Sequence, residues 1–349
     1  MLLDPSTWAL SQRADDVLSV TAEDLVGRRA AETHEAALEL KTAPHRSIHD
    51  AVIELRELRQ RLADDVAGLG IAAAAAGMHP DRPASATKVS PSSRYQIIER
   101  TMRGLAHRDP TFALHVHVGV PDAESAIRLL NRLRAHLPIF LALSATSPFK
   151  SGQYTGLASN RTVVFQGFPR TGLPRRFDGY GDWVNTVDLL VRSRAIPEPT
   201  FLWWDIRPQP RLGTIEIRIM DAQPRLSATA ALCALVQSVA RLELEEEYAS
   251  PALVDAQEAL AENRFLAVRD GARAQLIDPA DGIRLPLPEI VAELLAAARP
   301  HAEALDAVAE LDLVPALVQA PEATRQRAVA AAVGIPQLVA DLAERFTRD

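Results

Sequence analysis

The sequence predicts an α+β protein in which one curved antiparallel β-sheet has a polar face and is covered by helices on its other face. Four short segments alternate apolar residues with acidic residues, arginine and histidine, and long amphipathic stretches surround them. Because successive side chains of a strand point to opposite sides, this alternation places the apolar residues against helices and the polar residues together on the opposite face.

Composition limits the classes of partner. The chain has 349 residues, 48% of them hydrophobic and 24% charged, which is typical of a globular protein with a sizeable core. Asp and Glu (45) outnumber Lys and Arg (38), so no basic field favours nucleic acid or an anionic membrane. We see no signal peptide and no apolar run long enough to span a membrane, and the single Cys233 excludes an intrachain disulfide. These features predict a cytoplasmic protein with a buried structural thiol.

The first half of the chain contains several amphipathic helices. Ser47 and Asp50 resemble a capping box, and the apolar spacing that follows predicts a helix ending at Gly68 and Gly70. We expect a buried strand over 71–77, although its alanines could equally prolong the helix, and a loop over 80–92. Further helices are predicted over 93–106, 121–136 and 137–145.

The second half of the chain is predicted to contain a long loop, two strands, a long helix and a hairpin. Residues 147–178 lack periodicity and predict a long functional loop, and strands follow near 201–208 and 213–221. A long apolar helix is expected over 226–248, and a hairpin over 274–286 turns at Asp281 and Gly282. We divide the chain into an α+β core over 1–250 and a mostly helical extension over 251–349, packed into one structural unit.

The predicted strands place an unusual set of side chains on one face. That set is Glu35, Ala37, Glu39 and Lys41 from 35–41; His115 and His117 from 112–118; Trp203, Asp205 and Arg207 from 203–207; and Glu216 and Arg218 from 214–220, with Asp221 just beyond. An ordinary solvated face is the common explanation for one such strand, but it is usually rich in Lys, Thr and Glu. Carboxylates suit Mg²⁺ and arginine forks suit phosphate, so we favour a polar catalytic face.

Other chemistries fit parts of this set. His115 and His117 form an H-x-H pair that could bind Zn²⁺, although the surrounding acids favour an oxygen-ligand site. A metal-dependent hydrolase built on this pair is therefore the weakest of the alternatives. No glycine-rich phosphate-binding loop is present, so any nucleotide would be bound by the sheet face itself.

The same segments resemble the type 2 glutamate-cysteine ligase family, the YbdK-like carboxylate-amine ligases with a fold related to glutamine synthetase. The resemblance rests on motifs spread in order over most of the chain: Leu38-Glu-Leu-Lys-Thr42, His115-Val-His-Val-Gly119, Leu143-Ser-Ala-Thr-Ser-Pro148, Ala158-Ser-Asn-Arg161, Trp203-Trp-Asp-Ile-Arg-Pro208, Ile215-Glu-Ile-Arg-Ile-Met-Asp221, and Asn263-Arg264 through Arg269.

The resemblance implies an ATP- and Mg²⁺-dependent enzyme in which ATP phosphorylates a carboxylate, such as the γ-carboxylate of glutamate, and an amine displaces the phosphate. It implies that Glu35, Glu39 and Glu216, with Glu32 as a weaker candidate, bind Mg²⁺. His115 and His117 would contact nucleotide or metal, and Arg161 and Arg218 would neutralise the transferred phosphoryl group. Asp205, Arg207 and Asp221 would hold these groups or the substrates in place, with Asp221 on the nucleotide side.

One departure from the family pattern bears on activity. Family members usually carry a strand with an acidic cluster just before the segment that corresponds to Leu2-Leu-Asp-Pro5. Its absence makes a weak or inactive nucleotide-binding relative with a regulatory role the main alternative to a ligase. The expected partners are a small acid and a small amine, and a homodimer is plausible by resemblance.

Overall fold

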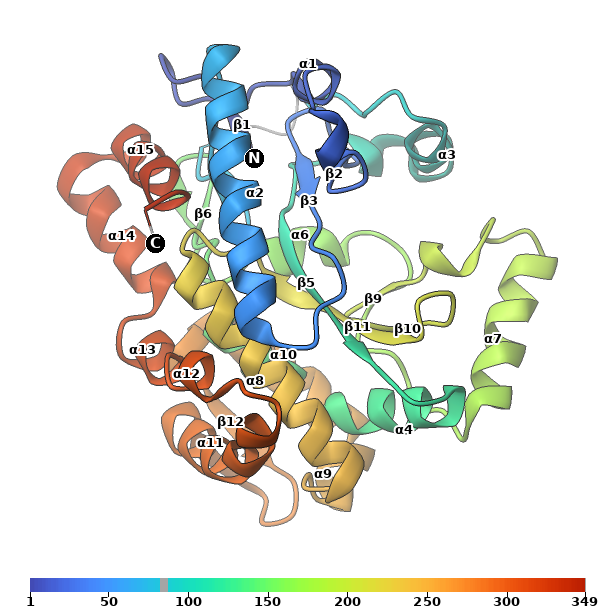
Figure 1. The fold of residues 1–349 in the computed structure, drawn as a ribbon. Coiled ribbons are helices and arrows are strands. Elements are labelled where there is room, and N and C mark those ends of the chain that lie inside the picture. Colours follow the sequence, from blue (N-terminus) through green and yellow to red (C-terminus); the bar gives the residue numbers. More distant parts are fainter. Residues whose placement is uncertain (82–86, 349) are drawn as a thin grey trace.

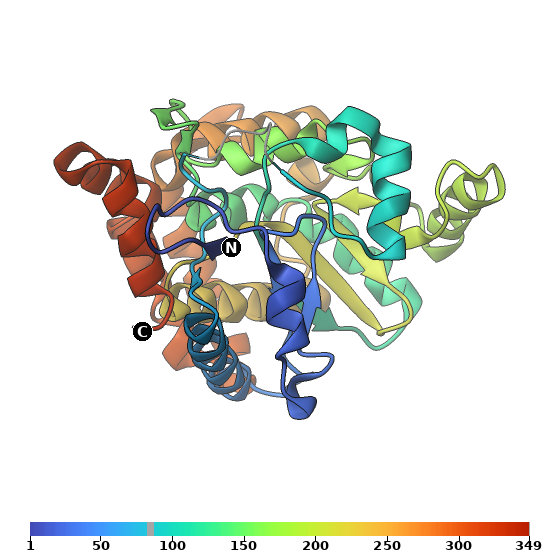
Figure 2. The same ribbon diagram turned by 90° about the horizontal axis from the view of Figure 1, so that it is seen from above.

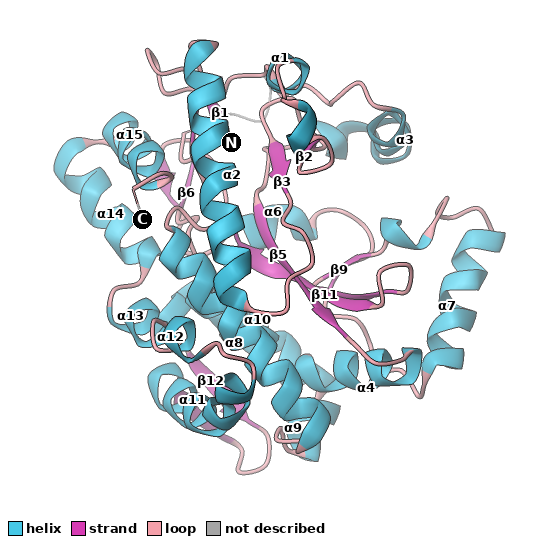
Figure 3. Ribbon diagram, in the orientation of Figure 1, coloured by secondary structure: helices cyan, strands magenta, loops and turns pink. Residues whose placement is uncertain are grey.

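The computed structural model describes residues 1–81 and 87–348 and confirms the predicted α+β class (Figure 3). Its central sheet contains β5 (Ala113–Gly119), β10 (Ile206–Gln209) and β11 (Thr214–Asp221), in the order β10-β11-β5. Both pairings are antiparallel, as predicted. Glu216 lies directly opposite Arg207 on one neighbour and opposite His117 on the other.

The predicted single sheet is divided into smaller ladders. The predicted strand over 35–41 is only β3 (Leu38–Leu40), which pairs with β2 (Arg29–Ala31) in a separate hairpin. The predicted strand near 201–208 is interrupted, because the backbone N–H of Asp205 donates to Gly172 while its carbonyl accepts from Arg218. As a result β9 (Trp203–Trp204) pairs in parallel with β8 (Thr171–Gly172).

The amino-terminal helices largely follow the prediction. Helix α2 (Ile48–Gly68) begins after Ser47, whose side chain accepts a hydrogen bond from the Asp50 N–H, as expected for a capping residue. The strand expected over 71–77 is shorter, because only β4 (Ala72–Ala73) pairs, with β1 (Leu2–Leu3). The remaining elements of this region are α1 (Ala14–Ser19), η1 (Glu23–Leu25), α3 (Ser93–Met102) and η3 (Arg103–His107). Part of the predicted loop over 80–92 lies outside the described residues.

The segment 147–178 is not the irregular loop that was predicted. It contains α6 (Asn160–Gln166), the short hairpin of β6 (Phe149–Lys150) and β7 (Gln153–Tyr154), and β8. Sequence periodicity missed α6 because the helix has only 7 residues, fewer than two full turns of apolar spacing. Helix α7 (Tyr180–Arg192) and η4 (Pro199–Phe201) lead from there to β9.

The main core lies against the apolar face of the sheet. Ile215, Ile217 and Ile219 of β11 are buried, and α4 (Ala123–Leu133), α5 (Leu137–Ser144) and α8 (Leu226–Glu245) contact the sheet strands. These helices correspond to the predicted ones, each ending within a few residues of the expected position. Cys233 of α8 is partly buried, and desolvation raises the pKa of its thiol to about 12, so the thiol stays protonated at neutral pH.

The carboxyl-terminal residues are mostly helical, as predicted. They form α9 (Pro251–Asp255), α10 (Gln257–Asp270), η5 (Gly271–Arg273), α11 (Leu287–Ala304), α12 (Val308–Leu311), α13 (Val314–Gln319), α14 (Glu322–Val333) and α15 (Ile335–Arg345). The predicted hairpin is present as β12 (Gln275–Asp278) and β13 (Ile283–Pro286). Helix α11 packs on α8, and α10 packs on α5.

Figures 1 and 2 show the central strands with helices at the periphery, α14 and α15 on one side of the molecule and α7 on the other. Within the described residues, no helix has the length and apolar character needed to cross a membrane.

Candidate active site

A buried carboxylate lies at the centre of the polar sheet face. Glu216 Oε2 accepts hydrogen bonds from Arg207 Nε at 2.7 Å and Gln209 Nε2 at 2.6 Å, and Glu216 Oε1 pairs with the Arg218 guanidinium. Burial alone would raise the pKa of Glu216, but the charges of Arg218 and Arg207 outweigh burial and hold this pKa well below its usual range. The carboxylate is therefore ionised, and it compensates two arginines.

The predicted histidine pair lies beside this carboxylate. His115 Nδ1 is 3.6 Å and His117 Nε2 is 4.0 Å from Glu216 Oε1. Desolvation lowers the pKa of both histidines, and the charge of Arg218 lowers that of His115 further. Both rings are consequently neutral near pH 7 and keep one nitrogen able to accept a hydrogen bond or bind a cation.

This burial predicts a pH dependence of stability. The unfolded chain binds a proton on His115 below its ordinary pKa near 6.5, whereas the folded chain does so only at lower pH. Stability should therefore fall as pH decreases below about 6.5, by at most about 1.4 kcal/mol per pH unit for this residue. In urea titrations between pH 7 and pH 5, His115→Gln should lose less stability than the wild type. His107→Gln, which alters an exposed histidine, should lose as much as the wild type; equal losses in all three proteins would contradict the prediction.

A second group of carboxylates faces Glu216. Desolvation raises the pKa of Glu39, and the nearby charges of Glu32 and Glu216 raise it further. Lys41 Nζ lies 3.1 Å from Glu39 Oε2 and has the opposite effect, lowering this pKa. Glu32 Oε1 also accepts a hydrogen bond from the Tyr95 hydroxyl at 3.0 Å. The hairpin β2–β3 thus brings Glu32 and Glu39 near the sheet face although it shares no backbone hydrogen bonds with that sheet.

Glu35 is positioned differently from the prediction. It lies in a turn before β3, where the Ala37 N–H donates to the His34 carbonyl, so strand alternation does not place it beside Glu39. Glu32, the weaker candidate, directly follows β2, whose Ala30 pairs with Glu39, and its charge raises the pKa of Glu39.

A β-bulge in β11 determines where Arg218 lies. Between the Ile217–Val116 and Met220–Leu114 pairs, β11 contains one more residue than β5. The two carbonyls in this bulge accept hydrogen bonds from Arg161, at 3.2 Å for Arg218 and 2.9 Å for Ile219. Arg161 is only 4% exposed and holds the bulge in place through these two hydrogen bonds, while its predicted contact with a phosphoryl group stays a prediction.

Asp221, at the end of β11, holds neighbouring segments in place through hydrogen bonds to its carboxylate. Its carboxylate is fully buried and accepts hydrogen bonds from the Thr146 N–H, the Ser147 hydroxyl and the Ser159 hydroxyl at 2.7 to 2.9 Å. Gly77 approaches so closely that a Cβ there would lie 2.5 Å from this carboxylate. The predicted contact with nucleotide would require Asp221 to leave these donors, and we assign it an anchoring role instead.

Asp205 has a partner that sequence reasoning did not assign. Arg264 of α10 donates to both carboxylate oxygens of Asp205, at 2.5 Å and 3.3 Å, and both side chains are buried. The two residues are 59 positions apart, and the apolar spacing of α10 gives no signal of the pair. This ion pair connects α10 to the break between β9 and β10, and thereby to the Asp205 carbonyl that accepts from the Arg218 N–H at 2.8 Å.

The polar face therefore has two electrostatic halves. Arginine and neutral histidine surround Glu216 on the sheet, while Glu32 and Glu39 supply negative charge from the hairpin. The Nε atom of Arg218 is buried without a hydrogen-bond partner in the described part of the chain. Within that part, no group of three or more His, Cys, Asp or Glu side chains is already arranged to hold a metal ion.

The fold and this face define an α+β protein with a charged site on an antiparallel sheet. Residues 2–332 match the model of glutamate-cysteine ligase family 2. The chain belongs to this family, which confirms the resemblance seen in the sequence.

Relatives agree with this assignment. Two proteins of Rubrobacter xylanophilus, provisionally named glutamate–cysteine ligase 2-1 and 2-3, are 37% and 38% identical to the chain. The alignments cover 93% of this chain and 86% of the first relative, and 97% and 93% for the second. A Sorangium cellulosum protein provisionally named glutamate–cysteine ligase 2 is 39% identical, over 88% of this chain and 82% of the relative.

The fold is also similar to that of a solved structure. This is the glutamate–cysteine ligase (gshA) of Francisella tularensis, crystallised in complex with AMP, with a TM-score of 0.69. The alignment covers 100% of this chain and 87% of the other at 16% identity. At this identity the comparison shows the shared fold.

Proposed function

We propose that the chain is an ATP-dependent carboxylate–amine ligase of the glutamate–cysteine ligase type. In this reaction the γ-phosphoryl group of ATP moves to a substrate carboxylate, and an amine then attacks the acyl phosphate and releases phosphate. ADP and an amide are the other products. Family membership and the names of the relatives support the reaction class.

One observation carries the proposal, namely the division of the polar face into a cationic half and an anionic half. Phosphoryl transfer needs its charge neutralised and its reactants positioned more than it needs covalent help from the protein. Arg218 offers a buried Nε that has no hydrogen-bond partner among the described residues, and Glu216 orients its guanidinium. We assign Arg218 to the transferred phosphoryl group, with Arg207 and Glu216 holding it in place.

The anionic half fits a hard divalent cation. The carboxylates of Glu32 and Glu39 lie close enough for Glu32 to raise the pKa of Glu39, and a cation would relieve this repulsion. Glu216 already accepts from Arg207, Gln209 and Arg218, so it is a weaker ligand than predicted. When bound, Mg²⁺ would neutralise phosphate oxygens of ATP, and neutral His115 and His117 would complete the nucleotide side of the site.

Removal of the Glu39 carboxylate should therefore remove most of the stabilisation by magnesium. Mg²⁺ at 100 times its Kd should stabilise the wild type by about 2.7 kcal/mol, since it binds only the folded site. In thermal unfolding without nucleotide, Glu39→Gln should lose most of this gain. Glu344→Gln, which alters an exposed carboxylate paired with Arg348, should keep it. A full magnesium response in Glu39→Gln would remove Glu39 from the cation site.

The direct test of function is ADP release from ATP and Mg²⁺ with glutamate plus cysteine, followed by a panel of acids and amines. Turnover that requires both the acid and the amine is the expected result. Saturable ATP binding with no turnover for any pair would instead support a nucleotide-binding relative with a regulatory role. Absence of ATP binding would contradict both functions.

A further inference from the structure

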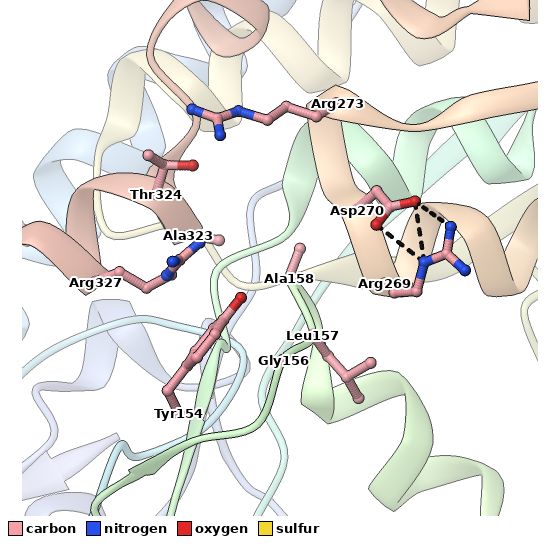
Figure 4. A pocket seen from close by; sticks show the side chains of 10 residues that line it. All are labelled: Tyr154, Gly156, Leu157, Ala158, Arg269, Asp270, Arg273, Ala323, Thr324 and Arg327. Atoms are coloured by element: carbon pink, nitrogen blue, oxygen red, sulfur yellow. Dashed lines mark hydrogen bonds and ion pairs between the residues drawn. The ribbon is translucent and has the colours of Figure 1, made fainter.

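A hollow of about 250 Å³ lies outside the polar sheet face (Figure 4). Three separate segments line it: residues 154–158, which begin with the last residue of β7, the end of α10 with η5, and the first turns of α14. None of the residues predicted for the active site lines it. Its role is therefore not explained by the proposed ligase reaction.

Three arginines from two of these segments surround the hollow. Arg269 and Arg273 come from α10 and η5, and Arg327 comes from α14, while Asp270 is the only acidic residue in the described lining. Asp270 pairs with Arg269 at 2.7 Å, so one of the three positive charges is compensated locally. The hollow keeps an excess of two positive charges.

The other two arginines have no anionic partner among the described residues. Arg327 places its guanidinium over the Tyr154 ring, 4.2 Å from the centroid, and no carboxylate pairs with it. The Arg273 side chain has no hydrogen bond or ion pair in the described structure, and Figure 4 shows it extending from η5 toward Thr324 of α14. Both side chains are exposed, so their N–H donors face solvent and are open to an anion.

The chemistry of the lining favours phosphate over a carboxylate. One arginine fork satisfies a planar carboxylate, whereas a phosphate presents oxygens in several directions and can accept from forks on different sides. Ala323 and Thr324 line the hollow from the first turn of α14, where the helix adds partial positive charge. The volume suits a phosphate group with a small organic part and is below the range typical of drug-sized ligands.

We propose that this hollow is a second anion site, separate from the sheet face, that binds the phosphate group of a small phosphorylated molecule. Arg273 from η5 and Arg327 from α14 provide the contacts, and Arg269 contributes through its remaining donors. A bound phosphate would connect α14 to the end of α10, because these arginines belong to different elements.

Calorimetric titration of the full chain with inorganic phosphate and pyrophosphate, at constant ionic strength, tests this site. Arg273→Ala and Arg327→Ala should each weaken the affinity about 10-fold or more. Arg284→Ala removes an exposed arginine of β13 outside the hollow, and it should bind as the wild type does. The Arg273 side chain forms no hydrogen bond or ion pair with any described residue, so its replacement should not destabilise the fold. A loss of affinity in Arg273→Ala is therefore not explained by misfolding.

Two further titrations test whether the phosphate binds at the hollow rather than on the sheet face, and whether the hollow prefers phosphate to a carboxylate. Arg218→Ala should keep phosphate binding at the hollow, whereas loss of binding only in Arg218→Ala would place the phosphate on the sheet face and overturn the proposal. Citrate should bind more weakly than pyrophosphate, and a preference for citrate would overturn the assignment to phosphate. Unsaturable binding, or equal affinity in all variants, would show that the hollow is not a site. None of these outcomes depends on ligase activity.

Discussion

Replacing Arg218 with alanine is expected to lower acid- and amine-dependent ADP release about 10²- to 10³-fold, the usual loss when one preorganised donor to transition-state charge is removed. Arg218 lies on the β11 bulge, its guanidinium pairs with Glu216, and its Nε has no partner in the described structure. The loss should appear in kcat more than in KM, because charge on the phosphoryl group increases in the transition state.

Steady-state kinetics with saturating ATP measure this effect. Arg211→Ala, in the turn between β10 and β11, removes an exposed arginine near the same strands and should leave kcat within about twofold. Arg218→Lys keeps the charge but loses the planar fork, so only part of the activity should return. If Arg218→Ala keeps wild-type kcat, Arg218 has no part in the chemistry and the assignment of the cationic half fails.

The second large effect concerns stability. Arg264→Met should destabilise the folded chain by about 3–5 kcal/mol, because it leaves the buried Asp205 carboxylate without its cation. Asp205 and Arg264 are both under 10% exposed, so water cannot replace the lost partner without opening the core. Urea titration at pH 7 measures the free energy of unfolding.

A double variant separates the ion pair from its burial. Asp205→Leu combined with Arg264→Met removes both charges, and it should lose much less stability than the single change, since an apolar pair can replace a buried ion pair. Arg192→Met, which breaks the exposed pair with Asp188, should cost less than about 1 kcal/mol. A double variant as unstable as Arg264→Met would show that the loss comes from packing and not from the unpaired charge.

The sequence predicted the elements whose signals are local. Capping at Ser47, the Asp281–Gly282 turn and the alternation in β5 and β11 depend on neighbouring residues, and the structure confirms each of them. Alternation also placed His117, Arg207 and Glu216 together correctly, because the side-chain period of a strand holds wherever the strand is regular.

Only the tertiary structure decided where the regular strands are interrupted and which charged side chains pair with each other. The turn before β3 separates Glu35 from Glu39, and the extra residue in β11 determines the position of Arg218, yet neither changes the apolar spacing that a sequence pattern detects. The Arg264–Asp205 pair and the arginine-lined hollow join residues far apart in the chain. Sequence by itself determined the fold class, the family and the types of charge on the sheet face. Packing decided which charged groups anchor the fold and which remain free for a ligand, because hydrogen-bond partners are fixed by contacts in space.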